Sequence, residues 1–258
     1  MNELDTPPTN DSPETPARSS LMSRMLNVIA APSEVFDEIR SAPHRTVNWL
    51  VPAMLLTWAG CVGLLLCFSQ PAIQQQMDDI IAKAMDKQAA QVPMNDQARQ
   101  LGEKIGKLSM KISMLAEPVV TGFAMPFWWG LVLWVVGSKV YKGGFSYMKA
   151  VEVAGLTNVV CLLEFMVRTL LAIALGSLFA GLHLGMVVQD FDAANPAHMS
   201  LAAANLFSFW ALAVRALGLA KLGGISFGKA LATLFVLWVV FMAAMTGCSL
   251  ALQRLGGP

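Results

Sequence analysis

Long apolar runs alternate with polar connections along the chain. Five runs of about twenty residues or more stand out, at residues 47–69, 118–138, 153–181, 201–220 and 230–252. The charged residues inside them are Glu164 and Arg168 in the third run and Arg215 in the fourth. A helix of about 20 apolar residues crosses the roughly 30 Å hydrocarbon core of a bilayer. The pattern therefore predicts an all-α membrane protein whose membrane domain, residues 47–258, has five transmembrane helices.

Residues 21–46, just before the first run, are amphipathic. Apolar residues line one face of each of two short helices that meet at Pro32: Leu21, Met25, Val28 and Ile29, then Val35, Phe36 and Ile39. Charged residues fill the other side, which is typical of a helix lying in the membrane interface. The same pattern fits a helix packed beneath the bundle as ordinary core, and both interpretations stay open. Residues 1–20, rich in Pro, Ser, Thr and acids, are expected to be a disordered cytoplasmic tail.

The connection at residues 70–117 is too long to be structureless. Each half carries an apolar seam with heptad spacing, namely Ile73, Met77, Ile80 and Ala84, and then Leu101, Ile105, Leu108, Ile112 and Leu115. Pro93 breaks the two halves apart, and Asn95 can cap the second. We predict a helical hairpin whose seams face each other. Dimerisation is the alternative, but two heptads are short for a coiled coil between chains, which favours the hairpin.

Composition narrows the class of protein. Apolar residues make up 55% of the 258 residues and charged residues 14%, against about 25% charged in an average soluble domain. The net charge of +1 leaves no basic excess for a phosphate backbone, so nucleic acid is not expected as a partner. The four cysteines all lie inside apolar runs and are expected to be buried thiols.

Lys and Arg in the connections predict the orientation. The N-terminal segment and the second and fourth connections hold nine of them, against seven on the other side. Six of those seven lie in the long connection at residues 70–117, where acidic residues balance them. We therefore expect a cytoplasmic N-terminus and an outer C-terminus.

Glu164 and Arg168 form the candidate intramembrane polar pair. They lie one helical turn apart, so they can pair on one face and lower the cost of burying charge. A transporter could use Glu164 as a proton or cation site, whereas a purely structural pair would fix helix register. Glu152 and Arg215 lie nearer the predicted cytoplasmic ends of their helices and are expected to snorkel to the surface.

Known catalytic patterns are missing from the sequence. It contains no H-E-x-x-H or G-x-G-x-x-G motif and only three histidines, and its one G-x-S-x-G match, residues 224–228, follows an apolar helical run rather than the strand that this motif requires. His183, His198, Asp190 and Asp192 all belong to the outer end of the third span or its loop, so a surface metal site there is the alternative. We expect no catalytic, metal or cofactor site.

Two connections repeat the same turn. Residues 143–150 match residues 223–230, and upstream Trp129 and Gly137 match Trp210 and Gly218. The shared turn residues are Gly143, Gly144, Ser146 and Lys149 in the first copy and Gly223, Gly224, Ser226 and Lys229 in the second. Glycine permits a positive φ, serine can cap the next helix, and lysine suits the headgroup region. Local structure therefore explains the repeat without a ligand.

The segment before the first span contains the pattern P-x-x-x-F-x-x-I-x-x-x-P, formed by Pro32, Phe36, Ile39 and Pro43. With the segments 209–212, 218–220 and 224–226, they make residues 21–252 resemble the prokaryotic form of the YIP (Ypt-interacting protein) domain family. The resemblance implies five helices, a cytoplasmic N-terminus, a bacterial cytoplasmic membrane and no established enzymatic activity. Eukaryotic relatives associate with small GTPases, but their D-L-Y-G-P type motif is absent here.

These observations favour a non-enzymatic scaffold or adaptor. Its expected partners are membrane lipid, a second copy of the chain or another membrane protein. The segment 32–43 and the fourth span are the expected contact surfaces, with Phe36 as an exposed anchor. The alternative is a small transporter or channel that uses the Glu164–Arg168 pair.

Overall fold

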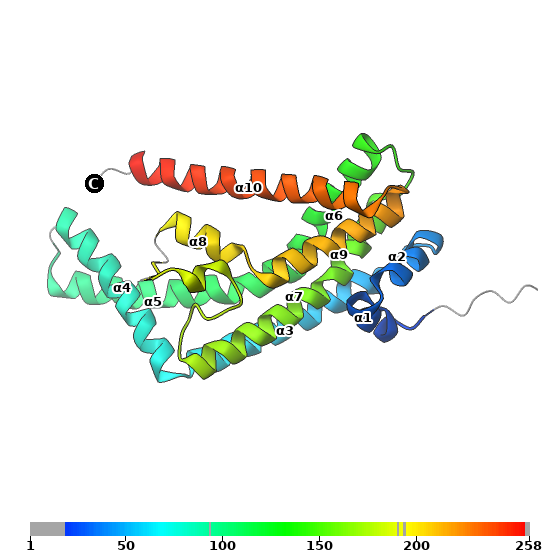
Figure 1. The fold of residues 1–258 in the computed structure, drawn as a ribbon. Helices are drawn as coiled ribbons and strands as arrows, with labels where there is room; N and C mark the ends of the chain where they lie inside the picture. Colours follow the sequence, from blue (N-terminus) through cyan, green and yellow to red (C-terminus); the bar gives the residue numbers. More distant parts are fainter. Residues whose placement is uncertain (1–18, 93, 190, 193–194, 256–258) are drawn as a thin grey trace, which may run out of the picture.

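The computed structural model describes residues 19–92, 94–189, 191–192 and 195–255, and these residues are overwhelmingly helical. Figure 1 shows the long helices running roughly along one direction, with a helical hairpin at one end and two short helices at the other. The helices are α1 (Leu21–Ala30), α2 (Pro32–Ser41), α3 (Val47–Phe68), α4 (Pro71–Gln91), α5 (Asp96–Val119), α6 (Met125–Val135), α7 (Tyr147–Leu175), α8 (Pro196–Ala203), α9 (Leu206–Gly223) and α10 (Phe227–Leu255). Three short segments complete them: the π-helical turns η1 (Val120–Ala124) and η2 (Val136–Val140), and the 3-10 turn η3 (Leu184–Val187).

Five helical segments among the described residues are long and apolar enough to cross a membrane. They are α3, the continuous helix from α5 to η2, α7, α9 and α10. The prediction of an all-α protein with five spans is therefore confirmed. A hydrocarbon core of about 30 Å needs only about 20 helical residues, so the 45-residue second segment extends well beyond it.

The ends of the third and fourth spans differ from the sequence prediction. α7 ends at Leu175 because Gly176 adopts a left-handed conformation with φ of 58°, so the apolar residues up to 181 are not helical. The run beginning at Leu201 lies partly in α8, and α9 starts only after Asn205. The side chain of Asn205 accepts a hydrogen bond from Ser208 N at 2.7 Å, which fixes the start of α9.

The second span is irregular where it enters the bundle. Pro118 removes a backbone donor from the helix, and the π-helical turn η1 follows directly. Neighbouring helices satisfy two carbonyl groups there: Thr57 on α3 donates to Pro118 O, and Asn158 on α7 donates to Gly122 O, both at 3.1 Å. The partly buried Thr57 and the buried Asn158 thus stabilise an imperfect helix, as expected where the membrane offers no water.

The N-terminal helices pack on the bundle rather than offering their apolar faces outward. α1 contacts α7, and α2 contacts α9. Val28 and Phe36 are fully buried in the main core. The expectation of Phe36 as an exposed anchor is therefore wrong, because the apolar faces of these helices cover the bundle end. The predicted disordered tail lies outside the described residues except for Ser19 and Ser20, both of which make hydrogen bonds.

The predicted hairpin of α4 and α5 is confirmed, but the facing of its seams is wrong. α4 packs against the glycine side of α5: a Cβ at Gly106 would lie 3.2 Å from Ile81 Cγ2, and one at Gly102 would lie 2.8 Å from Met85 Sδ. Glycines let two helices approach closely, so they form the contact in place of the bulky residues. The heptad seam of α5 consequently points away from α4 and is exposed at Leu101, Ile105, Leu108 and Ile112.

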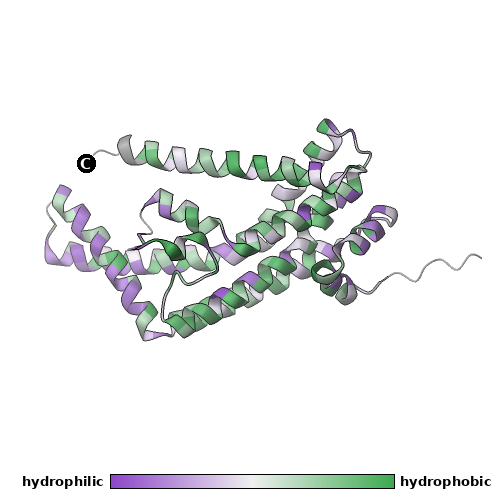
Figure 2. Cartoon of the chain, in the orientation of Figure 1, coloured by the Kyte–Doolittle hydropathy of each residue, from purple (hydrophilic) through white to green (hydrophobic). Residues whose placement is uncertain are grey.

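Figure 2 shows that the hairpin of α4 and α5 is predominantly hydrophilic, whereas α10 is apolar along most of its length. Two ion pairs join the hairpin arms, Lys107–Asp78 and Arg99–Asp86, each at 2.6 Å. At its base, Ile73 and Met77 of α4 are buried in a small core with Leu64 of α3. The hairpin is thus an extension of the membrane domain that is joined to it by an apolar base.

The two repeated turns are in contact with each other. A Cβ at Gly143 would lie 2.9 Å from the Cα of Gly223, so a side chain would push the turns apart. Gly224 has the expected positive φ of 66°, but in the first turn Lys142, with φ of 56°, takes that role instead of a glycine. Ser146 sits at the N-cap of α7 without a side-chain capping bond, so that expectation is also wrong.

The remaining residues of the repeat have local roles. Lys149 Nζ donates to the backbone oxygen of Arg40, which ties α7 to the end of α2. The backbone oxygens of Ser226 and Lys229 accept hydrogen bonds, from Ala230 N and from Tyr141 Oη. Gly144 has open space around it. The repeated residues therefore contribute to the two turns and to their contacts with α2 and α10.

Candidate functional site

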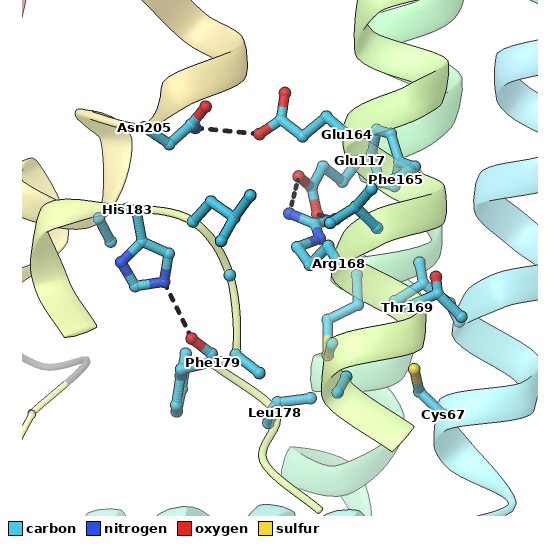
Figure 3. Close-up of a pocket in the computed structure, with 18 of the residues that line it drawn as sticks. Cys67, Glu117, Glu164, Phe165, Arg168, Thr169, Leu178, Phe179, His183 and Asn205 are labelled. Carbon is cyan, nitrogen blue, oxygen red and sulfur yellow. Dashed lines mark hydrogen bonds and ion pairs between the residues drawn. The ribbon is translucent and has the colours of Figure 1, made fainter. Parts of the chain in front are cut away.

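A cavity of about 480 Å³ lies at the hairpin end of the bundle. Its walls come from α3, α5, α7, the connection after α7, α8 and the start of α9. Figure 3 shows Glu164, Arg168, Glu117, Asn205 and His183 around it. Most of the remaining lining is apolar, including Leu64, Phe165, Ala172 and Leu178. The cavity therefore combines apolar walls with a small set of charged and hydrogen-bonding groups.

The charged groups pair differently from the sequence prediction. Arg168 forms two hydrogen bonds to Glu117, Nη1 to Oε1 at 3.0 Å and Nη2 to Oε2 at 3.1 Å. Glu164 Oε1 accepts a hydrogen bond from Asn205 Nδ2 at 3.0 Å. No ion pair joins Glu164 to Arg168 in the part of the chain that the structure describes. Both residues do line the cavity, as their spacing on α7 indicates, but each has a partner from another helix.

Sequence analysis missed Glu117 because it lies in the connection before the second span rather than inside an apolar run. Its position directly before Pro118, at the entry to the span, is a usable signal for a charge at the membrane boundary. Asn205 has two roles, since its Oδ1 caps α9 while its Nδ2 donates to Glu164. The chain direction at the start of α9 thus places the amide toward α7.

The cavity has more carboxylate than cation. Arg168 is neutralised by Glu117, whereas Glu164 has only the amide of Asn205 within hydrogen-bond distance among the described residues. Arg168 also lies over the ring of Phe165, with Cζ 4.4 Å from the ring centroid. An apolar cavity with one carboxylate that lacks an ion-pair partner suits a proton or a cation-bearing ligand.

The loop residues near the cavity engage the backbone. His183 Nε2 lies 2.9 Å from Phe179 O, and His198 Nδ1 accepts a hydrogen bond from Asp192 N at 3.1 Å. Asp190, the fourth residue considered for a metal site, lies outside the described residues. Within those described, no three His, Cys, Asp or Glu side chains are grouped to hold a metal ion.

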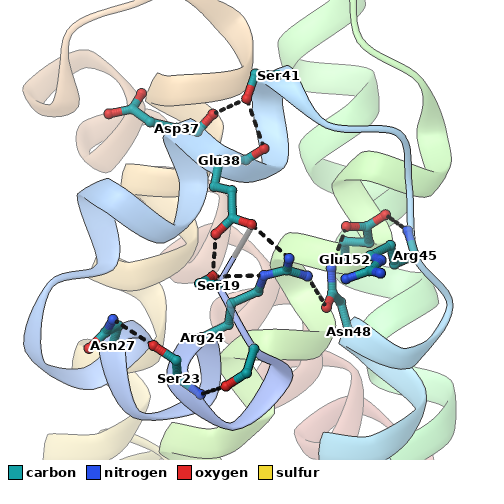
Figure 4. A network of polar contacts seen from close by, with 11 residues as sticks. Ser19, Ser23, Arg24, Asn27, Asp37, Glu38, Ser41, Arg45, Asn48 and Glu152 are labelled. Atoms are coloured by element: carbon teal, nitrogen blue, oxygen red, sulfur yellow. Dashed lines mark hydrogen bonds and ion pairs between the residues drawn. The ribbon is translucent and has the colours of Figure 1, made fainter. Parts of the chain in front are cut away.

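A second polar network lies at the opposite end of the bundle (Figure 4). Arg24 of α1 donates to Glu38 at 2.7 Å, to Asn48 at 3.0 Å and to Ser19 at 3.1 Å. Asn48 in turn donates to Glu152 of α7 at 2.8 Å, and the backbone N–H of Arg45 also donates to Glu152. The network therefore joins α1 and α2 to α3 and α7.

The network favours the charged, carboxylate form of Glu38. Burial alone raises the pKa of its carboxyl, but the hydrogen bond from Ser19 and the pairing with Arg24 outweigh burial, so the pKa of Glu38 lies below its ordinary value. The carboxylate form of Glu38 is thus the one that the folded protein stabilises.

Glu152 and Arg215 do not snorkel as expected. Glu152 is 1% exposed and belongs to the network around Asn48. Arg215 is 7% exposed, and its guanidinium lies over the ring of Trp129, with Cζ 4.5 Å from the ring centroid. Trp129 is one of the residues that the sequence repeat singled out, and stacking on Arg215 gives it a function within the core.

The proline-flanked motif before the first span has a structural place. Pro32 is the first residue of α2, and Phe36 and Ile39 are buried against the main core. Pro43 lies in the extended segment between α2 and α3. The spacing of the motif therefore places Phe36 and Ile39 on the same face of α2, and this face packs against the bundle.

These features define an integral, multi-pass, all-helical membrane protein with two short N-terminal helices packed against its end. The family model of the Yip1 domain matches residues 26–247, which is nearly the whole chain. The chain belongs to the Yip1 domain family, as its resemblance indicated. No curated protein and no solved structure matches it.

Proposed function

We propose that this protein is a non-enzymatic membrane adaptor that binds a transmembrane helix of another protein through α10. The observation that carries the proposal is how little of α10 packs on its own chain. Of its most apolar 18-residue stretch, 6% is buried, against 56% for α9. Among the described residues, the main contacts of α10 are with α9 and α8, and Figure 1 shows it along one side of the bundle.

One face of α10 is suited to close helix packing. Ala243, Gly247 and Ala251 recur every four residues and are all exposed. A Cβ at Gly247 would meet no atom within 4 Å, so a neighbouring backbone has room to approach. Small residues at this spacing allow helices in membranes to pack closely. The spacing is visible in the sequence, and its exposure supports an interface in the membrane.

Photo-crosslinking in intact membranes tests the adaptor function. A photoreactive amino acid at Ala243 should give an adduct with a second membrane protein, and Gly247→Leu should remove that adduct. Met245 is the matched control, because it is exposed on the opposite face of α10. Adducts from Ala243 that contain only lipid or a second copy of this chain would overturn the proposal.

A small transporter is the second candidate, and the cavity around Glu164 favours it. The test is flux in vesicles that contain the purified protein, with a pH-sensitive dye inside. Glu164→Gln should abolish proton flux, whereas Glu103→Gln on the hairpin should leave it unchanged. Wild-type flux equal to that of empty vesicles would exclude proton transport.

We further propose a cytoplasmic N-terminus and an outer C-terminus in a bacterial cytoplasmic membrane. The distribution of Lys and Arg in the short connections supports this orientation. The hairpin and the connection between α7 and α9 would then both be external. Reporter fusions at Pro258 and Asn195 should both report the outside, and a cytoplasmic signal from either would overturn the orientation.

A further inference from the structure

The outward seam of α5 is a row of large aliphatic side chains without cover. Leu101 is 59% exposed, Ile105 58%, Leu108 61% and Ile112 58%. The seam continues toward the membrane at Leu115, which is partly buried, and at Val119, which is 42% exposed. Steps of four and three residues keep these side chains on one face of the helix over nearly three heptads.

The surroundings of the seam distinguish it from the lipid-facing spans. Exposed leucines on α10 lie within a continuous apolar segment, where lipid covers them. The seam instead lies on the hydrophilic hairpin (Figure 2), between charged residues such as Glu103, Lys104 and Lys107. Large apolar side chains in water cost free energy, and a contiguous row of them marks an interaction surface.

The residue types in the seam specify the kind of partner. With the 4–3 spacing, Ile105, Ile112 and Val119 occupy the a positions, and Leu101, Leu108 and Leu115 occupy the d positions. β-branched residues at a with leucine at d favour a parallel, two-stranded coiled coil. We propose that α5 pairs with α5 of a second copy of this chain in a parallel coiled coil, which makes the protein a homodimer.

The continuity of α5 with the second span also requires a parallel pair of α5 helices. α5 continues as one helix through η1 and α6 into the second span. Two copies inserted in the same orientation are related by a two-fold axis along the membrane normal, so their α5 helices point the same way and lie at the same height. Two-fold symmetry in a membrane therefore requires the parallel, in-register arrangement that the isoleucine and leucine positions favour.

The flanking positions permit this pairing. In a parallel dimer, Lys104 at g faces Ser109 of the other copy at e, and Lys111 at g faces Ala116 at e. No like charges oppose each other across the seam. Lys111 is in addition turned toward its own chain, with Nζ 5.6 Å from the ring centroid of Phe68. α4 occupies the glycine side of α5 and leaves the seam open.

Disulfide trapping of the full-length protein in lipid bilayers tests the dimer. In a Cys248→Ser background, which removes the exposed native thiol, Leu101→Cys and Ile112→Cys should each form a homodimer with a mild oxidant. The two positions lie near opposite ends of the seam, so only a parallel, in-register pair brings both into disulfide range. Ser113→Cys is the matched control, because it is exposed on α5 outside the seam.

The oligomeric mass in nanodiscs provides an independent measurement. The wild type should have the mass of a dimer, and Ile105→Lys with Leu108→Lys should give a folded monomer, with Lys104→Glu as a control that keeps the dimer. A monomeric wild type, equal trapping at Ser113, or trapping of a different protein at Leu101 would overturn the proposal. Gly247→Leu should leave the dimer intact, so this result is separate from the adaptor test on α10.

Discussion

The two ends of the bundle use the same kinds of side chain in different ways. At the N-terminal end, Arg24, Asn48 and Glu152 are at most 2% exposed, and each is hydrogen-bonded to another part of the network. At the hairpin end, Arg168 and Glu117 are 32% and 44% exposed beside a cavity. Each end thus has an arginine, an acid and an asparagine, but only one end is tightly packed around them.

The difference comes from what covers each end. α1 and α2 lie directly over the N-terminal network, and their apolar faces seal it. At the other end, the connection after α7 and helix α5 do not close over the charged residues, and the cavity lies between them. Charged residues among apolar helices are therefore not functional by type alone. A closed, fully bonded network stabilises the fold, whereas a carboxylate that faces a cavity is available to a ligand.

Removal of Arg24 should have the largest effect. Removing Arg24 leaves the buried amide oxygen of Asn48 without its donor, which typically costs about 1–3 kcal/mol, and Glu38 loses its cation as well. Arg24→Met should therefore strongly reduce folded yield and the melting temperature in detergent, followed by tryptophan fluorescence. Arg40→Met, at an exposed site on α2, is the control and should stay near wild type. Equal melting temperatures for the two variants would show that the N-terminal network is not structural.

Close packing at the N-terminal end gives the second prediction. A Cβ at Gly155 would lie 2.2 Å from Trp49 Cβ and 2.4 Å from its Cα, so the backbone of α3 would have to move. Overpacking of this kind typically costs about 1–3 kcal/mol. Gly155→Ala should therefore lower the melting temperature, whereas Gly228→Ala, where the added Cβ meets open space, should not. A harmless Gly155→Ala would contradict the tight packing of this end.

Much of this fold follows from hydropathy alone. Uncharged runs such as residues 47–69 and 230–252 could be read as spans because length and composition suffice. Helix ends were less predictable, since Gly176 and Asn205 stop or start a helix inside an apolar stretch. The hairpin was predictable as a pair of helices, but its packing was not. The contact of Gly106 with Ile81 decided which face of α5 turned inward.

The candidate site could be predicted only in part. Glu164 and Arg168 were identified because they interrupt an apolar run, and both line the cavity. Their partners Glu117 and Asn205 come from other helices, and spacing within one helix carries no information about such contacts. Phe36 illustrates the same limit, because an amphipathic helix has an apolar face whether lipid or protein covers it.

The open end should tolerate changes that the closed end does not. Arg168 and Glu117 form a partly exposed pair, and such pairs are typically worth up to about 1 kcal/mol. A double-mutant cycle with Arg168→Leu and Glu117→Leu should give a coupling energy of that size from melting in detergent. The same cycle with Glu164→Leu should give less, because Glu164 bonds to Asn205 instead. A larger coupling of Arg168 to Glu164 would restore the pairing that the sequence suggested.

Acid should produce the smallest effect, through Glu38 at the closed end. The pKa of Glu38 is lowered in the folded protein, so its contribution to stability is present above the unfolded-state pKa of about 4.3 and is lost as pH falls through the folded-state pKa. Because Glu38 is 24% exposed, the contribution should be about 1 kcal/mol or less. The stability difference between wild type and Glu38→Gln should therefore be constant from neutral pH to about pH 5 and shrink toward zero below about pH 4.

Glu34→Gln, on the exposed side of α2, makes the same change of net charge and serves as the control. Limited proteolysis between α2 and α3 across this pH range measures the release of the N-terminal helices. A difference that grows on acidification would mean that Glu38 prefers its neutral form, and the network would then not be held together by charge.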